Sequence, residues 1–464
     1  MAVQHYDIAI LGGGPAGAAM AIRMAQMGYR VVLCEQHATP PFHIGLSLSP
    51  GVRHWLGQLG VAQRVESAGF GPAQQSVVLW ESDEPMQKHY AREQAGYHAD
   101  RSILDEILLQ RAQEAGAELL RPCKVSACQW QQPYWHIAGT HDGSAYSVKA
   151  RFLVEATGRS RIIKSRKQAY RPATLATYSI YPYQGTAPDW SFIEAGPAGW
   201  YWGAPLSRGY LMCVFSDIPS SANGKGHKAA YRTHVEGNSL ISKLPLSRPA
   251  TLPVTACTAT PCYDAETIAH NFIKIGDSAF TMDPLSSQGI QKAMKSAIQG
   301  AVAVHTLLAG RDPETALAYY RNMITREVQT AGKISRDFYA RQGRYDSAFW
   351  ASRRVGASAL PAADQEITLR KDDVLHLNPD ATVKKVPVLG KQYIEAEEGI
   401  LLNGHEPLVY LNGYPVAALS QALHNVPVFQ TLPIISQYMP GMPPAKVLQH
   451  LIYHRVLCRK PAMT

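Results

Sequence analysis

Short apolar runs and helical periodicities alternate along the first part of the chain. The apolar runs Tyr6 to Leu11 and Arg30 to Cys34 predict buried strands, and the spacing of apolar residues from Ala18 to Met27 predicts a helix between them. This order predicts a βαβ unit of a parallel sheet. A longer helix is predicted from Ile103 to Glu114, with Gly116 just past its end.

The middle of the chain has a strand-rich pattern. Strand-like segments occur at Val125 to Trp130, Trp135 to Ala138 and Phe152 to Ala156. From Thr174 to about Thr260, many aromatic residues lie between turn residues. This second pattern predicts an inserted sheet domain.

The last part of the chain returns to helices and then changes again. A buried strand is predicted at Asn271 to Ile275, and helical periodicity runs from Gln288 to about Arg341. After Ala359 the strands are short, and helical segments are predicted at Val416 to His424 and Ala445 to His454. This C-terminal pattern predicts a small separate α+β domain.

Composition places the chain among globular enzymes. Of 464 residues, 46% are apolar and 17% are charged, and no apolar stretch reaches the roughly 20 residues that cross a bilayer. The first residues lack the features of a signal peptide, so a cytoplasmic protein without a membrane partner is expected. The seven cysteines form no CxxC pair, which predicts reduced thiols and no metal site.

The formal net charge of +9 is compatible with an anionic cofactor. The basic residues are scattered, and the densest run, Arg159 to Lys167, is interpreted as a solvated loop. A nucleic acid partner is therefore not expected.

The glycine-rich segment from Gly12 to Gly17 fits the GxGxxG pattern between a predicted strand and a predicted helix. In this pattern Gly12 permits the tight turn, Gly14 lets the backbone approach a pyrophosphate, and Gly17 lets helix and strand pack closely. Glu35 ends the second strand, where its carboxylate can accept hydrogen bonds from a ribose. A glycine turn without a ligand is the alternative, but the complete βαβ context favours a dinucleotide site.

A second motif lies far downstream, where Ile275-Gly276-Asp277 is followed by Asp283-Pro284 and by Gln288-Gly289-Ile290. With this pair of motifs, the chain resembles the FAD-dependent monooxygenase and halogenase superfamily, which has the fold of the aromatic hydroxylases. The resemblance covers roughly residues 5 to 350 and implies that Asp277 binds the ribityl chain of FAD. It also implies that the helix starting near Gly289 faces the flavin ring and stabilises its reduced form.

The resemblance extends to single positions between the two motifs. Arg101 matches an arginine that reaches toward the flavin, although a surface arginine is the simpler alternative. Val125 matches a backbone contact to adenine, and Gly158 matches a loop near the pyrophosphate. The implied cofactor-binding residues are Gly12, Gly14, Pro15, Ala16, Gly17, Glu35, Gln36, Arg101, Val125, Gly158, Gly276, Asp277, Pro284, Gly289 and Ile290.

These observations give an expected domain organisation. We expect an α/β protein in which a Rossmann-type FAD-binding domain, residues 1–173 and 261–365, carries an inserted β-sheet substrate domain, residues 174–260. A small C-terminal α+β domain spans residues 366–464.

Three departures narrow the expected chemistry. First, Thr157-Gly158 replaces the Asp-Gly pair of hydroxylases that bind NAD(P)H, and this departure argues against direct binding of NAD(P)H. Reduction of FAD by NAD(P)H directly and reduction through a separate flavin reductase both stay open. Second, the segment Gly199 to Pro205 resembles the WxWxIP motif of flavin-dependent halogenases, with Ala204 in place of isoleucine. Two tryptophans at i and i+2 that simply share one face of a buried strand are the alternative.

The third departure concerns the lysine that carries active halogen in halogenases. The segment that aligns best with the lysine-bearing one, Ser67 to Ser76, has no lysine, and Gln288-Gly289 replaces the halide-binding Ser/Thr-Gly pair. Halogenation is therefore disfavoured.

The remaining expectation is an FAD-dependent monooxygenase that hydroxylates an electron-rich aromatic ring through a flavin C4a-hydroperoxide. Tyr178, Tyr181, Trp200 and Trp202 are the expected aromatic wall of the substrate pocket. The pattern singles out no catalytic base. A free aromatic metabolite and a tryptophan inside a partner protein both stay open as substrates, and the latter resembles tryptophylquinone cofactor biogenesis.

Three alternative functions remain. A halogenase would need an unrecognised lysine such as Lys88. A flavin reductase of isoprenoid double bonds, similar to geranylgeranyl reductases, shares the Gly-Asp motif and would form product without oxygen. A flavin-binding assembly factor without turnover would keep its partner binding when Trp202 is replaced.

Overall fold

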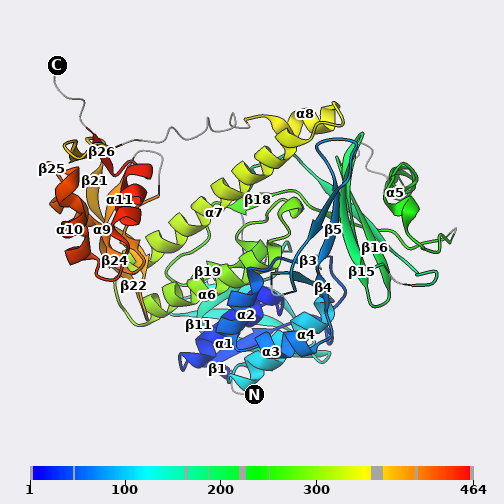
Figure 1. Cartoon of the computed structure of the whole chain (residues 1–464). Coiled ribbons are helices and arrows are strands. Elements are labelled where there is room, and N and C mark those ends of the chain that lie inside the picture. The colour runs from blue at the N-terminus through cyan, green and yellow to red at the C-terminus, as the bar shows by residue number, and fades with distance from the viewer. Residues whose placement is uncertain are drawn as a thin grey trace. The chain divides into compact units, whose positions relative to one another are not determined.

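The computed structural model describes residues 4–44, 47–92, 94–160, 162–163, 166–186, 188–218, 226–249, 251–356, 369–402 and 406–459. The chain divides into two compact units. Residues 1–309 and 320–359 form the first unit, and residues 310–319 and 360–464 form the second (Figure 1).

The first unit contains a sheet with a parallel centre and an antiparallel extension. Its strand order is β8-β2-β1-β11-β10-β9, with β19 paired in parallel to β11. The strands are β1 (Gln4–Leu11), β2 (Val31–Cys34), β8 (Glu118–Leu120), β9 (Cys123–Gln131), β10 (Tyr134–His141), β11 (Ser144–Glu155) and β19 (Phe272–Lys274). Because β1 and β19 both run parallel to β11, the two motifs, which directly follow β1 and β19, lie at the same edge of the sheet.

Helix α1 (Pro15–Gln26) packs against two longer helices of the first unit, α4 (Arg101–Glu114) and α6 (Gly289–Leu308). Small buried residues make this close packing feasible, since Ala18, Ala19 and Ala21 of α1 are fully buried. Helix α1 also contacts β1 and β2, so the predicted βαβ unit is present (Figure 1).

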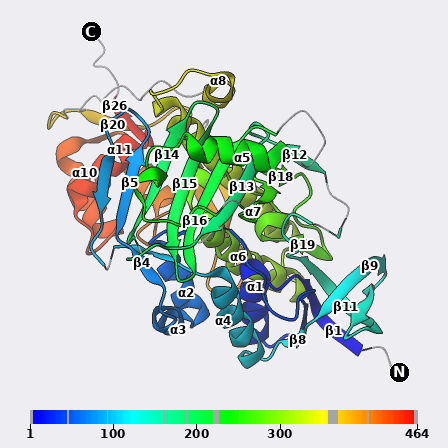
Figure 2. The same ribbon diagram turned by 90° about the vertical axis from the view of Figure 1, so that its right-hand side faces the viewer.

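The second large sheet of the first unit has the strand order β17-β13-β16-β15-β14-β5-β6. Its strands are β5 (Gln75–Leu79), β6 (Met86–His89), β13 (Leu175–Tyr181), β14 (Trp190–Gly196), β15 (Gly199–Leu206), β16 (Gly209–Ser216) and β17 (Thr255–Thr258). Helix α5 (Gly226–Glu236) contacts β13 and β16 on one face, as Figure 2 shows. Strands β5 and β6 precede the predicted insertion in the sequence, and β5 joins the sheet by parallel pairing with β14.

Smaller elements complete the first unit. The remaining strands are β3 (Ser47–Leu48), β4 (Gly71–Ala73), β7 (Gly96–His98), β12 (Lys167–Ala169) and β18 (Cys262–Asp264). The remaining helices, including the 3-10 helices η1 to η3, are α2 (Val52–Leu59), α3 (Ala62–Ser67), η1 (Ile241–Lys243), η2 (Gly276–Ser278), η3 (Pro284–Ser286), α7 (Pro313–Arg341) and α8 (Ala348–Arg354). Helix α7 begins in the part of the chain assigned to the second unit.

From residue 369 onward, the described part of the second unit has seven strands, three helices and a separate apolar core. Its strands are β20 (Val374–Leu377), β21 (Thr382–Leu389), β22 (Ile394–Leu401), β23 (Tyr410–Leu411), β24 (Tyr414–Pro415), β25 (Val426–Pro427) and β26 (Leu457–Arg459). Its helices are α9 (Val416–Ala422), α10 (Val428–Tyr438) and α11 (Pro444–Tyr453). The core includes the fully buried Leu375, Leu419, Ile435 and Leu451.

Most elements expected from the apolar pattern are present within a few residues of their predicted bounds. Helices α2, α5 and α10 were not predicted, and α10 contains Pro433, a residue that is unfavourable inside a helix. All seven cysteines are free, which confirms the prediction of reduced thiols. Over the residues that the structure describes, no helix is long and apolar enough to span a membrane, and no cluster of three or more potential metal-ligating side chains occurs.

Candidate active site

A cavity of about 700 Å³ in the first unit contains both sequence motifs. It extends from the glycine turn after β1, past the turn that contains Asp277, to Trp200 and Trp202 on β15. The two motifs are therefore lining residues of one cavity, although more than 250 positions separate them in the sequence. Both large sheets contribute to its wall.

The glycine turn leaves room for a ligand at one position only. Gly12 has a φ of +101°, and a Cβ there would lie 2.5 Å from the carbonyl oxygen of Ala156. A Cβ on Gly17 would lie 1.9 Å from the carbonyl oxygen of Gly12. A Cβ on Gly14 would meet no protein atom within 4 Å, and Gly14 lines the cavity.

The start of α1 next to Gly14 also fits a phosphate group. Gly14 is the N-cap residue, and no side chain caps the N–H groups of the first turn. Uncapped N–H groups at the positive end of a helix are a favourable environment for an anion. The turn therefore fits the pyrophosphate of a dinucleotide such as FAD.

The acidic residue at the end of β2 is held in place by the backbone. Glu35 accepts hydrogen bonds from the N–H of Gly13 at 2.7 Å and from the N–H of His37 at 2.9 Å. Gln36 and Val125 line the same end of the cavity. These positions fit the adenosine half of FAD, with the carboxylate of Glu35 oriented by Gly13.

Asp277 lies in a cationic environment on the opposite side of the cavity. Its carboxylate accepts a hydrogen bond from Lys292 Nζ at 2.6 Å, and Arg159 Nε lies 3.7 Å from its second oxygen. Burial raises the pKa of Asp277, but the two cations outweigh burial, so the pKa lies below its usual range. An ionised carboxylate that is 39% exposed can accept hydrogen bonds from the hydroxyls of a ribityl chain.

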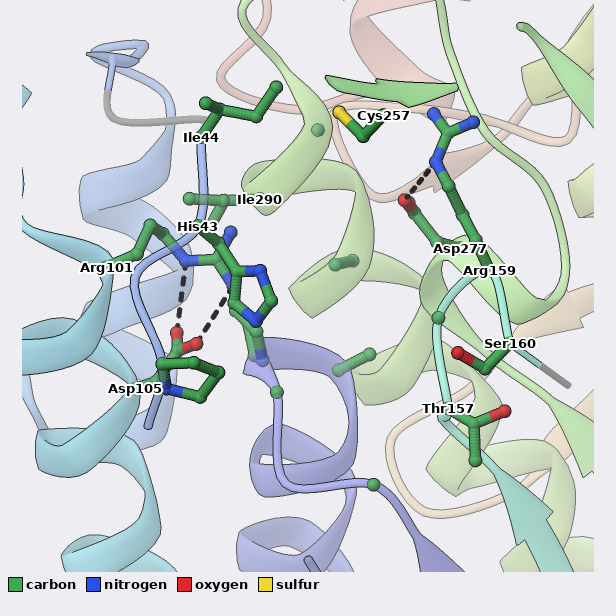
Figure 3. A pocket seen from close by; sticks show the side chains of 18 of the residues that line it. His43, Ile44, Arg101, Asp105, Thr157, Arg159, Ser160, Cys257, Asp277 and Ile290 are labelled. Carbon is green, nitrogen blue, oxygen red and sulfur yellow. Dashed lines mark hydrogen bonds and ion pairs between the residues drawn. The ribbon is translucent and has the colours of Figure 1, made fainter. Parts of the chain in front are cut away.

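Arg159 corrects the interpretation of Arg159 to Lys167 as a solvated loop. The side chain of Arg159 lines the cavity and pairs with Asp277 (Figure 3). Sequence reasoning missed this role because the segment was assessed for nucleic acid binding, although Arg159 directly follows Gly158 of the predicted pyrophosphate loop.

The first turn of α6 is open toward the cavity. Gln288 provides no side-chain cap, and a Cβ on Gly289 would meet no protein atom within 4 Å. Gly289, Ile290 and Pro284 all line the cavity. This helix end has free space for a flat ring, and its dipole favours negative charge on that ring.

Arg101 is fixed by a neighbouring carboxylate. Its guanidinium forms two hydrogen bonds to Asp105, at 3.1 and 2.9 Å, and both side chains line the cavity. His43 lies next to this pair in Figure 3. Burial and the charge of Arg101 lower the pKa of His43, so its imidazole is neutral near pH 7. His43 and Asp105 were not identified from the sequence, because neither belongs to a motif.

The aromatic wall is formed by three of the four predicted residues. Tyr178, Trp200 and Trp202 line the cavity, and the two tryptophans share one face of β15. Tyr181 is different, because it is buried in the core on the opposite face of β13, near Tyr231. Positions three apart on a strand point to opposite faces, so Tyr178 and Tyr181 were incorrectly grouped.

Behind the aromatic wall lies a buried polar chain. Trp200 Nε1 donates a hydrogen bond to Tyr339 Oη at 3.1 Å, and Tyr339 donates to Asp283 Oδ1 at 3.5 Å. Asp283 also accepts hydrogen bonds from the backbone N–H of Leu285 and from Ser335. Burial raises the pKa of Asp283. The chain orients Trp200 and links it to a carboxyl group that lines the cavity.

Two of the predicted cofactor residues lie behind the cavity wall. Gly17 packs against Gly12, as described above. Gly276 has a φ of +59°, and a Cβ there would lie 2.7 Å from the Cβ of Ala16. Their contribution is the close packing of α1 against β1 and η2. The remaining predicted cofactor residues line the cavity: Gly12, Gly14, Pro15, Ala16, Glu35, Gln36, Arg101, Val125, Gly158, Asp277, Pro284, Gly289 and Ile290.

Lysine is rare in the wall of this cavity. Among the described residues that line it, the single lysine is Lys124, next to Val125 at the adenosine end. Lys88 lies on the exposed strand β6 and does not line the cavity. No residue of the segment from Ser67 to Ser76 lines it either.

Comparisons with known proteins identify a family and several similar proteins. A family model described as tryptophan halogenase matches residues 72–374. A tryptophan 2-halogenase from Chondromyces crocatus is 28% identical over 76% of this chain and 71% of its own length. A putative FAD-dependent oxidoreductase, LodB from Marinomonas mediterranea, is 27% identical over 78% of this chain and all of its own.

Solved structures extend the likeness to nearly the whole chain. The peptidyl tryptophan dihydroxylase QhpG, essential for tryptophylquinone cofactor biogenesis, is 25% identical with a TM-score of 0.75, over 97% of this chain and 99% of that chain. The flavin-dependent halogenase CmlS is 18% identical with a TM-score of 0.81, over 100% and 97% of the two chains, and this likeness concerns the fold alone. The α/β fold with several sheets is thus that of flavin-dependent halogenase structures.

Proposed function

The chain belongs to the tryptophan halogenase family of flavin-dependent enzymes, and from this premise we propose that it is an FAD-dependent monooxygenase that hydroxylates an electron-rich aromatic ring. A single observation favours hydroxylation over halogenation, and it concerns the residues that line the aromatic end of the cavity. Around Tyr178, Trp200 and Trp202, none of the described lining residues is a lysine.

The residues of this chain would hold FAD along the cavity. The turn at Gly14 would bind the pyrophosphate, Glu35 the ribose, and Asp277 the ribityl hydroxyls, while the first turn of α6 would face the flavin ring. When bound and reduced, FAD supplies the activation of O2. We assign the first sheet, with residues 1–173 and those of residues 261–365 that belong to the first unit, to cofactor binding and residues 174–260 to the substrate wall.

The aromatic end of the cavity would position the substrate and exclude water. Trp200 is fixed by its hydrogen bond to Tyr339, and Phe215 stacks on it with ring centroids 3.9 Å apart. A fixed aromatic wall favours a flat, electron-rich ring by offset or edge contacts. Oxygen insertion consumes O2, two electrons and two protons and yields the hydroxylated ring and water. During the step the attacked ring carbon gives up its proton, which a base in the cavity would accept.

His43 is the residue that we assign as acceptor of the ring proton. Its lowered pKa leaves the imidazole of His43 neutral near pH 7, so the ring can accept a proton although it lies beside Arg101. The other histidine among the described lining residues is His37, which lies next to Glu35 at the adenosine end. We favour His43 because its chain neighbours Phe42 and Ile44 pack in one apolar cluster with Trp202 of the aromatic wall.

A tryptophan inside a partner protein is the substrate class that we favour. The support is the likeness to QhpG, a peptidyl tryptophan dihydroxylase, over nearly the full length of both chains. A free aromatic molecule is the alternative outcome of the experiment below. Thr157-Gly158 in place of an Asp-Gly pair supports reduction by a separate flavin reductase.

Halogenation is the second candidate, because the 28% identical relative is named as a tryptophan halogenase. One experiment separates the two functions. The enzyme loaded with FAD is incubated with tryptophan-containing peptides and with free phenols, in the presence of a flavin reductase, NADH, O2 and bromide. Mass spectrometry then measures the masses of the products. We expect products that contain more oxygen than their substrates, and no product that contains bromine. Brominated product would overturn the assignment.

Two controls address the remaining alternatives. Product formed under strict anaerobiosis would favour a reductase, and it is not expected. Trp202→Ala is expected to retain FAD and to lose oxidation, whereas an assembly factor without turnover would show no oxidation in either protein. Trp202 is a suitable position because it lines the cavity from β15, whereas the predicted phosphate-binding turn directly precedes α1.

A further inference from the structure

A second cavity of about 570 Å³ lies in the first unit, on the other side of one wall of the candidate active site. The two cavities share no described lining residue, but neighbouring residues line them. Asp100 lines the second cavity and Arg101 lines the first. Leu206 lines the second and packs in one apolar cluster with Trp202, which lines the first. The segment Ala68 to Pro72, which aligns with the lysine region of halogenases, also lines this second cavity.

The second cavity contains a buried histidine without a partner. His98 is 7% exposed, and neither of its ring nitrogens has a hydrogen-bond partner. Buried polar groups in folded proteins almost always have partners, and an unsatisfied one costs free energy. Burial lowers the pKa of His98 to about 4, so the ring is neutral near pH 7. A neutral imidazole offers one N–H donor and one acceptor nitrogen to a ligand.

The remaining wall defines which ligand would fit. Apolar and aromatic surface comes from Phe70, Tyr90, Ile103 and Leu206. None of the described lining residues is a lysine or an arginine, whereas two are aspartates, so an anionic ligand is disfavoured. The hydroxyl of Tyr183 is already engaged, because it donates to the carbonyl of Leu206 and accepts from its N–H. Gln74, His89 and Ser207 also line the cavity, but among the described lining residues His98 is the one that is buried with both ring nitrogens unpaired, so we assign it to orient the ligand.

We infer that this cavity is a second binding site, for a neutral aromatic ring that carries an N–H or O–H group, such as an indole or a phenol. The ring would lie against the apolar wall, and its polar group would complete the hydrogen bonds of His98. The inference does not depend on the reaction at the first cavity. If the proposed oxygenation failed, the second site would still be open to direct test.

The test uses FAD-loaded full-length protein with p-cresol and indole as probes. Isothermal titration calorimetry measures total binding, while the flavin absorbance spectrum reports a ligand next to the flavin. Ile103→Trp fills the second cavity, and Ile218→Trp is the matched control, because both isoleucines are exposed, at 44% and 49%, and Ile218 does not line that cavity. Binding that leaves the flavin spectrum unchanged is assigned to the second cavity. We expect Ile103→Trp to abolish this binding and Ile218→Trp to retain it.

Substitutions of His98 test the hydrogen bonds. His98→Leu is expected to weaken that binding about tenfold, and His98→Gln, which keeps a donor and an acceptor, to stay within about threefold of wild type. Flavin content and tryptophan fluorescence verify that each variant folds. Equal binding in wild type, Ile103→Trp and His98→Leu would overturn the inference. So would crystals soaked with 4-bromophenol in which bromine scattering is absent from the second cavity.

Discussion

At the scale of single residues, the sequence identified the motif positions, but it could not identify side chains that reach the cavity from elsewhere. Asp277 and Gly14 were found because their types and spacing form patterns. Arg159 and His43 were missed because their roles depend on neighbours distant in sequence, namely Asp277 and Arg101. Tyr181 was assigned to the wrong face because two aromatic residues three positions apart on one strand were treated as equivalent.

The pairing of Lys292 with Asp277 gives a first prediction. Lys292 is 3% exposed and also donates a hydrogen bond to the carbonyl of Phe280, so Lys292→Met removes a buried cation from beside the carboxylate. We expect a loss of about 1–2 kcal/mol in unfolding free energy, less than for a fully buried pair because Asp277 is 39% exposed. We also expect a higher pKa of Asp277 and reduced FAD content.

Lys295→Met is the matched control for this prediction. Lys295 lies one turn along α6 and pairs with Glu327 at 2.5 Å, but its side chain is 33% exposed. The exposed pair is expected to contribute no more than about 1 kcal/mol and to leave FAD content unchanged. Urea unfolding and flavin absorbance measure both quantities. Equal effects of the two substitutions would contradict the special role of Lys292.

His43 gives a second prediction at this scale. If it accepts the ring proton, His43→Gln should lower kcat by about 10²–10⁴-fold with FAD content unchanged, while His37→Gln should leave kcat nearly constant. Because the pKa of His43 lies below 6.5, kcat should be level near pH 7 and decline only at lower pH, as the imidazole becomes protonated. Steady-state rates from pH 5 to 8 measure this. A level profile with unchanged kcat in His43→Gln would remove His43 from the mechanism.

The buried His98 predicts a pH dependence of stability. Its pKa is about 4 in the folded protein and near 6.5 when unfolded, so below pH 6.5 the unfolded state gains a proton that the folded state does not. The contribution of His98 to the unfolding free energy is present above pH 6.5 and is lost as the pH falls toward 4. The total loss is about 3 kcal/mol. The unfolding free energy of His98→Gln minus that of wild type should therefore rise by this amount from pH 7 to 4. A constant difference would contradict the buried, neutral state.

At the scale of elements, local patterns predicted strands and helices well but could not predict which strands pair. The apolar runs at β1, β2 and β19 predicted that these strands belong to one parallel sheet, because a βαβ unit allows few other strand arrangements. Strand β5 pairs with β14 from across the sequence and β6 pairs with β5, and β6 is entirely exposed, so no apolar pattern indicated its sheet. Pairing of this kind depends on long-range register rather than on local periodicity.

The turn between β1 and α1 provides a prediction that separates binding from folding. Gly14→Ala adds a methyl group that meets no protein atom within 4 Å, and Gly14 has an ordinary φ of −68°, so the variant should fold. The methyl group would occupy the space assigned to the pyrophosphate. FAD affinity should therefore fall at least about tenfold, with the unfolding of the apoprotein nearly unchanged.

Gly17→Ala is the contrasting substitution in the same turn. Its methyl group would lie 1.9 Å from the carbonyl oxygen of Gly12, so the turn itself must distort. The loss of stability should exceed the roughly 1 kcal/mol of an average substitution, and little folded protein is expected. Flavin absorbance and circular dichroism distinguish the two outcomes. Full FAD binding by Gly14→Ala would place the pyrophosphate elsewhere.

At the scale of the whole molecule, the chain contains two compact units with separate apolar cores. The eight tryptophans all belong to the first unit, at positions 55, 80, 130, 135, 190, 200, 202 and 350. Tryptophan fluorescence therefore reports unfolding of the first unit alone, whereas circular dichroism reports both units. The sequence predicted a separate C-terminal part from its change in composition, but not that a short segment, residues 310–319, is grouped with it.

This separation predicts that the second unit can be destabilised alone. Leu451 is fully buried in the core of that unit, and Leu451→Ala should cost about 2–5 kcal/mol through lost burial and the cavity left behind. The circular dichroism transition of the second unit should move to lower urea, while the tryptophan transition and FAD content stay constant. Tyr453→Ala, in the same helix but 64% exposed, should change either transition by no more than about 0.5 kcal/mol. If Leu451→Ala instead shifts the tryptophan transition equally, the two units unfold cooperatively, and the flavin site depends on the C-terminal core for its stability.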